Sequence, residues 1–279
     1  MYDAVITTFR TRAFPPSPDL AGIVRRYVVV ARAGGAAELT PMIAWSKLRL
    51  VVHLAVPATV EMPAHRRLLE RPMVGGVVTR PFVMHTPGAR MEAFFVELTE
   101  PGFFGLFGDV ARELRDQTCD LWTLLPDAAR RSLRDELRER STDRERREAV
   151  EAFLRARMRN GSWQRESRHV SQALRVVHGS LALPQVRGLV RELGVSEAHL
   201  RRRFQAVMGT SPKSFLALER ARRAFLALRA RPHATGATIA TELGFFDQAH
   251  MIRELHKHTG HTPRELRDAR FAFAEAASR

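Results

Sequence analysis

The sequence contains a single cysteine, Cys119. One cysteine cannot form a disulfide within the chain or build a zinc site from several thiolates. The first ten residues, MYDAVITTFR, lack the basic-then-apolar pattern of a secretion signal. No apolar run approaches the roughly 18 residues that a membrane-spanning helix needs. These absences predict a protein of the reducing cytoplasm, with no membrane partner.

Patterns typical of enzymes are also missing. No glycine-rich phosphate loop, catalytic triad or carboxylate pair stands out. His53 and His85 lie in VVHLAV and VMHTPG, without the close spacing of a metal-binding histidine pair. We therefore expect no enzyme, no cofactor and no metal site. Cys119 and Trp45 are interpreted as core residues.

Positive charge, in contrast, is in excess. The formal net charge is +15, and residues 161–279 hold 20 Lys and Arg against 10 Asp and Glu. A basic region of this size favours a polyanionic partner, most often nucleic acid. Composition alone leaves a second interpretation open, in which a coding bias has inflated the arginine count.

Residues 1 to about 100 are predicted to form strands. VITTF, YVVVA, LRLVVHLAV and EAFFVEL are rich in β-branched and aromatic residues, and Pro and Gly clusters separate them. Frequent turns between short strands suggest a barrel or a sandwich. The sequence therefore predicts an α+β fold that begins with a β-rich sensor or dimerisation domain over 1–125.

Helical patterns begin after this region. GFFGLFGDVARELRD (102–116) has apolar residues at helical spacing. Two amphipathic helices are expected within 127–158, with a break near residues 141–143 where Ser or Thr can cap the second. The segment 126–164 is interpreted as a helical connector, either a dimerisation element or a solvated pair packed on its own domain. Residues 160–162 (NGS) are the expected domain boundary.

Residues 165–279 are predicted to be all-helical and contain an internal repeat. GVSEAHLRRRFQAVMGTSP (194–212) is echoed by GFFDQAHMIRELHKHTGHTP (244–263). In each copy a glycine can end one helix, and Ser or Asp can cap the next. The pattern is that of a helix-turn-helix, expected over about 186–208 and about 235–259 with a linker helix over about 212–230. The turn, cap and end residues are Gly194, Ser196, Gly209, Gly244, Asp247, Gly260 and Pro263.

The second helix of each copy has polar residues on its predicted outer face. In a helix-turn-helix this helix enters the major groove, where Arg pairs with guanine and Gln with adenine. Successive helical positions turn by about 100°, so Arg201 and Arg202 can address the groove while Arg203 reaches a phosphate or an acidic neighbour. The candidate DNA-binding residues are Ala198, His199, Arg201, Arg202, Gln205, Gln248, Ala249, Ile252 and Arg253. The phosphate-contact candidates are Arg203, Lys213, Lys257 and Arg264.

The region from about 168 to 270 resembles the AraC/XylS family of bacterial transcription regulators. The resemblance is carried, in order, by LGVSEAHLRRRFQAVMGTSPKSF, ERARRAFLAL and IATELGFFDQAHMIRELHKHTGHTPREL. The second unit departs from the family pattern at Phe246, Met251 and Ile252, so we expect it to offer fewer hydrogen-bonding groups. The resemblance implies base contacts by Ala198, Arg201, Arg202, Gln248, Ala249 and Arg253.

The segment MEAFFVELTEPGFFGLFGDVARELRDQTCDLWTLLP (91–126) is similar to a sensor-type domain attached to some members of this family. That similarity implies a small cupin-like β-barrel followed by helices, which binds an effector or mediates dimerisation.

The sequence therefore predicts a transcription regulator, an activator or a repressor, that reads two successive major-groove segments. Double-stranded DNA is the expected partner. A small-molecule effector at an unidentified pocket, a second copy of the chain in a homodimer and, for an activator, RNA polymerase are the further partners. A non-specific or architectural DNA-binding protein and a DNA-tethered cupin-type enzyme are the alternative functions.

Overall fold

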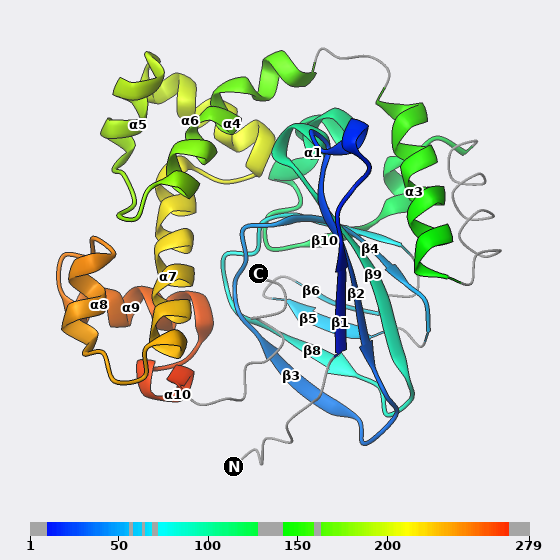
Figure 1. The fold of residues 1–279 in the computed structure, drawn as a ribbon, viewed down its shortest axis with the longest axis horizontal. Helices are drawn as coiled ribbons and strands as arrows, with labels where there is room; N and C mark the ends of the chain where they lie inside the picture. The colour runs from blue at the N-terminus through cyan, green and yellow to red at the C-terminus, as the bar shows by residue number, and fades with distance from the viewer. Residues whose placement is uncertain are drawn as a thin grey trace.

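The computed structural model describes residues 10–55, 58–62, 65–68, 72–127, 142–158 and 163–267. A β-rich N-terminal part lies beside a helical C-terminal part (Figure 1). Three sequence predictions fall outside the described residues: the strand VITTF, the first of the two connector helices and the boundary at residues 160–162.

The larger sheet has six antiparallel strands in the order β1-β2-β9-β4-β7-β10. Its central strands are rich in Val, Leu and Phe, which fit a pleated surface that is buried on both faces. The strands span Arg10–Phe14 (β1), Val24–Arg32 (β2), Leu48–His53 (β4), Met73–Gly75 (β7), Met91–Leu98 (β9) and Thr118–Asp120 (β10).

A smaller antiparallel sheet has the order β3-β8-β5-β6. Residues from the two sheets form one apolar cluster that contains Met42, Met62, Met73, Met84 and Met91. The predicted barrel-like domain is therefore two packed sheets, and the described strands do not close into a barrel. The strands of the smaller sheet span Glu38–Met42 (β3), Thr59–Met62 (β5), His65–Leu68 (β6) and Phe82–Thr86 (β8).

The other face of the larger sheet is covered by helices. The helix predicted over 102–116 is correct only in its first half, because α1 ends at Phe107 and Gly108 adopts a φ of 70°. That left-handed conformation stops an α-helix. Short 3-10 turns follow at Gly108–Arg112 (η2) and Leu121–Leu124 (η3), and an earlier one spans Pro18–Leu20 (η1); α1 itself is Glu100–Phe107.

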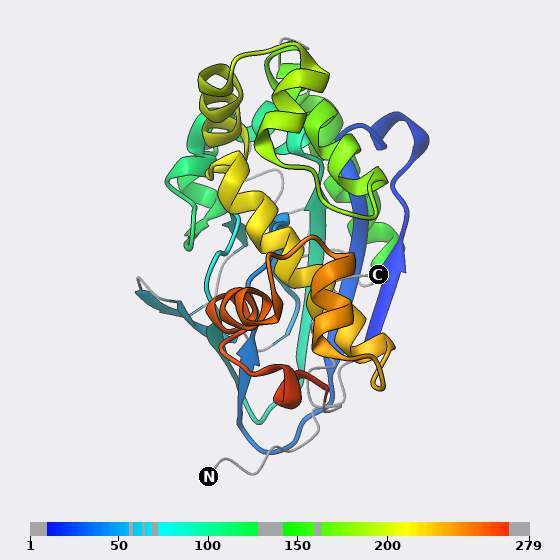
Figure 2. The same cartoon turned by 90° about the vertical axis from the view of Figure 1, so that its left-hand side faces the viewer.

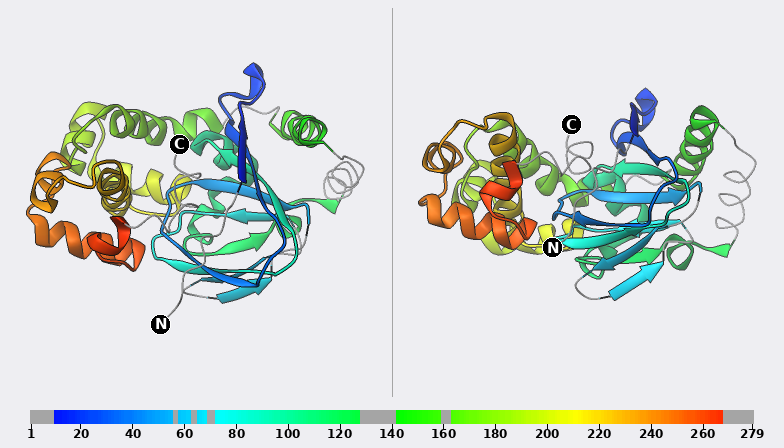
Figure 3. Two further views of the ribbon diagram at one scale, coloured as in Figure 1. Left: turned by 60° about the horizontal axis from the view of Figure 1, so that its bottom comes forward. Right: turned by 90° about the horizontal axis from the view of Figure 1, so that it is seen from below.

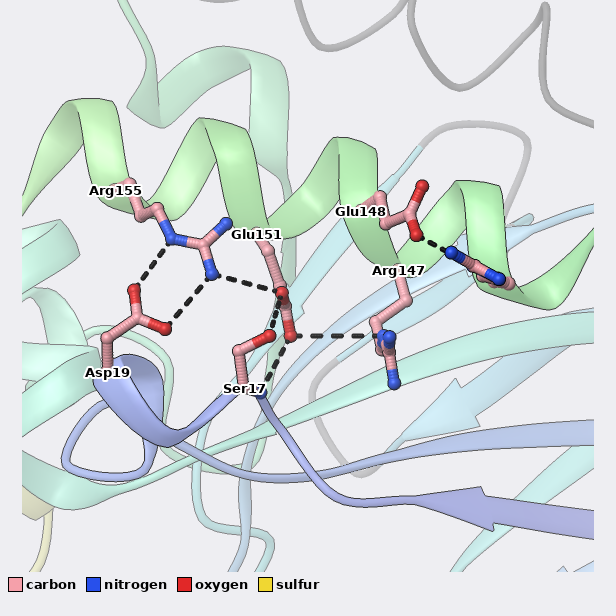
Figure 4. A network of polar contacts seen from close by, with 7 residues as sticks. Ser17, Asp19, Arg147, Glu148, Glu151 and Arg155 are labelled. Atoms are coloured by element: carbon pink, nitrogen blue, oxygen red, sulfur yellow. Dashed lines mark hydrogen bonds and ion pairs between the residues drawn. The ribbon is translucent and has the colours of Figure 1, made fainter.

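Helix α3 (Asp143–Arg157) packs on the same side of the larger sheet. Thr142 caps it in a reciprocal capping box with Glu145, as expected for a break near residues 141–143. Glu151 accepts hydrogen bonds from the main-chain N and Oγ of Ser17 at 3.0 and 2.6 Å (Figure 4). This network fixes α3 to the segment between β1 and β2.

The C-terminal part is all-helical. Helices α5 and α6 form one helix-turn-helix, α8 and α9 form a second, and α7 runs uninterrupted between them (Figure 2). This arrangement confirms the predicted fold class. The helices span Trp163–Gly179 (α4), Val186–Leu193 (α5), Glu197–Met208 (α6), Pro212–Ala230 (α7), Gly236–Glu242 (α8), Gln248–Thr259 (α9) and Pro263–Arg267 (α10).

The two helix-turn-helix units differ in where their cores lie. Leu200 and Phe204 of the first unit belong to a continuous core with Phe103 of α1 and Leu50 of β4. The second unit has its own core with the C-terminal half of α7, to which the N-terminal part contributes Ile43. Figure 3, viewed from below, shows the second unit beside the two sheets.

Candidate nucleic-acid interface

Each helix-turn-helix turn is built on a left-handed glycine and a side-chain cap. Gly194 and Gly244, which precede the second helices, have φ of 65° and 73°, a conformation that glycine adopts without steric cost. Ser196 Oγ accepts a hydrogen bond from His199 N at 3.2 Å, and Asp247 Oδ1 accepts one from His250 N at 2.6 Å. Both second helices end at left-handed glycines, Gly209 and Gly260, and Pro263 begins α10.

The outer face of α6 is open to solvent. Ala198, Arg201 and Arg202 are exposed, and Gln205 is half-buried. His199 is also half-buried, with its Nε2 3.1 Å from Nδ1 of His169 in α4. The histidine ring is thus turned toward α4, while the two arginines are free to reach a groove.

Arg203 lies on the side of α6 that faces α4. Its Nε donates to the main-chain oxygen of Glu166 at 2.9 Å, and its Nη2 lies 3.3 Å from the Glu166 carboxylate. Of the two roles expected for Arg203, the structure shows the contact with an acidic neighbour. A phosphate contact at this position stays a prediction.

The second recognition helix, α9, presents a less polar face. Gln248, Ala249 and Arg253 are exposed, and Ile252 is half-buried. Phe246, in the turn before the helix, is 92% exposed. The phosphate-contact candidates Lys213, Lys257 and Arg264 are all exposed.

The linker helix α7 is fastened to α4 by one arginine that sequence reasoning missed. The guanidinium of Arg223 donates to the main-chain oxygens of Val177, Ser180 and Leu181 at the end of α4. A single arginine thereby satisfies carbonyl groups that a helix end leaves without partners. No local pattern marks Arg223, because its acceptors lie more than 40 residues earlier in the chain.

A buried carboxylate connects α7 to the N-terminal part. Glu219 is 1% exposed and accepts hydrogen bonds from Ser46 Oγ and, at 3.0 Å, from Arg222 Nε. Burial alone would raise the pKa of Glu219, but the charge of Arg222 and the Ser46 hydrogen bond outweigh it and lower the pKa. Glu219 is therefore a fixed negative charge between the linker helix and the segment before β4.

The N-terminal part also contacts the second recognition helix. His258 of α9 lies with its Nδ1 2.7 Å from the main-chain oxygen of Thr79, and its own carbonyl accepts from Ala44 N at 2.8 Å. Burial lowers the pKa of His258. The end of α9 is thus held by loops of the β-rich part, on the side opposite Gln248 and Arg253.

The structure also shows where Cys119 and Trp45 lie, the two residues that the sequence assigned to the core. Cys119 is half-buried against the first core, and Trp45 packs edge-on against Phe82 with ring centroids 4.9 Å apart. Within the described residues, no three His, Cys, Asp or Glu side chains gather as a metal site. No helix in the described part of the chain has the length and apolar character needed to cross a bilayer.

Comparison with known proteins identifies the helical part. A model of the helix-turn-helix domain family matches residues 189–269, and no curated protein matches the chain. Three similar solved structures are the C-terminal domain of the two-component response regulator yesN from Fusobacterium nucleatum, ToxT from Vibrio cholerae O395 and the AraC-like transcriptional activator CuxR.

The yesN domain is 22% identical, with 35% of this chain and 96% of that chain covered and a TM-score of 0.33. ToxT is 8% identical, with 96% and 97% covered and a TM-score of 0.46. CuxR is 13% identical, with 71% and 80% covered and a TM-score of 0.25. With two capped helix-turn-helix units on one linker helix and a family match across both, residues 189–269 of this chain are a helix-turn-helix domain of the AraC type.

Proposed function

We propose that the protein is a sequence-specific DNA-binding transcription regulator in which α6 and α9 each read a major-groove segment. The observation that carries this proposal is the pair of outward faces, Arg201 and Arg202 on α6 and Gln248 and Arg253 on α9, all exposed. Both faces stand on capped helices with buried inner sides. A non-specific binder needs positive charge but not two such faces.

The length of α7 supports reading by a single chain. This helix has 19 residues, so it is about 28 Å long at 1.5 Å per residue. Successive major-groove segments on one face of DNA are about 34 Å apart, and the widths of the two units add to the separation. We propose that residues 165–279 bind DNA as one unit and that dimerisation is not required for two-site reading.

Phosphate contacts would supply much of the affinity. Lys213, Lys257 and Arg264 are exposed and lie at or beyond the ends of the recognition helices. Neutralising phosphates releases counterions, so affinity falls steeply with salt concentration. Base contacts by the outward faces would then provide the specificity.

The β-rich part is proposed to control DNA binding through a small-molecule effector. Its contacts with α7 through Ser46 and Glu219, and with α9 through Thr79 and His258, support this role. A change in the β-rich part would reach α9 through these contacts and α6 through the core that it shares with α1. We place the regulator in the cytoplasm, with RNA polymerase as a partner if it activates transcription.

Selection of bound duplexes from a random DNA library at near-physiological salt tests the function. Enrichment of two short elements about ten base pairs apart is the expected result. Duplication of the enriched site would reveal a dimer. Salt-dependent binding without enrichment would instead assign the protein to the non-specific or architectural class.

A further inference from the structure

A buried arginine faces the space between the two sheets. Arg49 of β4 pairs in register with Glu97 of β9, so both side chains share one face of the larger sheet. This face is opposite that of Leu48 and Leu50, which belong to the core under the helices. Arg49 is 3% exposed. A guanidinium this deeply buried normally has a hydrogen-bonded anion beside it.

Arg49 lacks such an anion. Among the residues that the structure describes, neither its Nε nor its Nη2 has a hydrogen-bond partner. The nearest carboxylate oxygen, of Glu97, is 3.7 Å from Nη2. Both oxygens of Glu97 are already occupied by Arg26, whose Nε and Nη2 donate at 2.9 and 3.2 Å. Arg26 and Arg49 therefore share the single carboxylate of Glu97. Its one negative charge can balance only one of the two guanidinium charges, so one positive charge remains between the sheets.

The unpaired atoms specify the chemistry of the missing partner. Nε and Nη2 lie on one edge of the guanidinium plane and point their N–H bonds in parallel, which matches the two oxygens of a carboxylate. Trp45 packs against this guanidinium, with its ring centroid 4.3 Å from the central carbon of Arg49. Its Nε1 is buried and, within the described residues, has no acceptor. A carboxylate could accept from both side chains.

The rest of the space between the sheets is apolar and adaptable. Five methionines belong to this cluster, and methionine side chains rearrange more easily than branched ones. His53, on the same face of β4 as Arg49 and four residues further along, is about 13 Å away at the usual rise of a strand. Both ring nitrogens of His53 are also buried without a described partner. This face of β4 thus has a buried cation at Arg49 and a neutral imidazole at His53, and Met73 of the methionine cluster pairs in register with Val51 between them.

We infer that Arg49 and Trp45 form the head-group site of a small-molecule ligand that has one carboxylate and an elongated apolar body lying among the methionines. The ligand carboxylate binds Nε and Nη2 of Arg49 side-on. The methionine side chains change conformation when the ligand binds, and its apolar body occupies the volume that they leave.

The segment that forms this site also holds the DNA-binding part. Trp45 and Arg49 face the interior, whereas Ile43, Ala44 and Ser46 contact α7 and α9. Lys47 lies between the two groups and interacts electrostatically with both Glu97 and Glu219. A carboxylate on Arg49 would change the charge balance around Glu97 and shift this segment. This coupling, unlike the ligand site itself, rests on the proposed function as a DNA-binding regulator.

Ligand binding is tested on the full chain without DNA. Decanoate and its shorter and longer homologues are titrated by calorimetry, with decanol as the uncharged match. Decanoate or a homologue is expected to bind and to raise the melting temperature, while decanol does neither. Arg49→Met should weaken carboxylate binding by about tenfold or more, and Arg49→Lys should restore part of it because the charge remains.

Three results would overturn the site: no carboxylate of the series binds the wild type, decanol binds as well as decanoate, or Arg49→Met binds as tightly as the wild type. Folding of Arg49→Met is checked by its melting temperature. Glu97 keeps its two hydrogen bonds from Arg26 in this variant, so the substitution leaves no buried carboxylate without a partner.

Coupling is measured separately, as the affinity for a selected duplex with and without the bound carboxylate. The expected result is a change of several-fold in the wild type and none in Arg49→Met. Carboxylate binding with unchanged duplex affinity would overturn the coupling but keep the site. Failure to select any duplex would count against the regulator function and not against the site.

Discussion

Gly209 stands so close to Ala111 that a side chain at position 209 would collide with the main chain of the β-rich part. A Cβ built on Gly209 would lie 1.9 Å from the carbonyl oxygen of Ala111. Gly209 also has a φ of 67°. The residue that ends the first recognition helix is therefore also the point where that helix docks on η2.

Gly209→Ala is expected to destabilise the protein much more than Gly244→Ala. Both glycines have a positive φ, which costs an alanine about 1–2 kcal/mol, but no atom lies within 4 Å of a Cβ at Gly244. The collision with Ala111 adds further strain, of about 1–3 kcal/mol. Urea unfolding of both variants measures the difference. Equal losses of unfolding free energy would show that the docking seen here is not maintained.

Arg201→Ala is expected to relax base preference at one position of the selected site. Loss of a bidentate contact to guanine costs about 1–3 kcal/mol, confined to that position. The measurement is competition binding with single-base variants of the site. Arg144→Ala is the matched control, since Arg144 is exposed on α3 and paired with Glu148. A uniform loss across all sequences would instead identify Arg201 as a phosphate contact.

His53 should make the protein less stable as the pH falls from 6.5 to 4. Burial lowers the pKa of His53 to about 4, from an ordinary value of 6.5. Within this window the unfolded chain binds a proton that the folded protein rejects, so acid favours unfolding. The full shift corresponds to about 3 kcal/mol.

His53→Leu removes this contribution and leaves the other titrating groups in place. Unfolding free energies at pH 7 and pH 4.5 should therefore differ less in His53→Leu than in the wild type. Identical pH dependence in the two proteins would show that His53 titrates normally in the folded state.

Arg223→Lys should weaken the attachment of α7 to α4. A lysine keeps the charge but cannot reach three main-chain oxygens with a planar fork, so a loss of about 1–3 kcal/mol is expected. Thermal and urea unfolding measure it, with Arg175→Lys on the exposed face of α4 as the control. Equal stability of the two variants would argue that water replaces the lost hydrogen bonds.

The sequence was most informative where structure depends on local signals. The caps at Thr142, Ser196 and Asp247 and the left-handed glycines act within a few residues of their own position, so pattern reasoning located these helix ends. The sequence pattern wrongly extended the helix past Gly108, because apolar residues continue at helical spacing beyond the glycine that ends the helix. It also missed Glu219, Arg223 and Arg49, whose partners are distant in sequence and are brought together only by tertiary packing.

The unequal cores of the two helix-turn-helix units have a consequence for folding. Leu200 and Phe204 share their core with α1 and the larger sheet as well as with α4 and α7, so removing the β-rich part would expose part of the inner side of the first unit. The second unit keeps most of its own core. A fragment that starts at residue 163 should retain slow amide hydrogen exchange in α8 and α9 while exchange in α4 and α6 becomes fast. The stability of the first helix-turn-helix unit thus depends on contacts with the β-rich part, whereas the second unit is stabilised mainly by its own core.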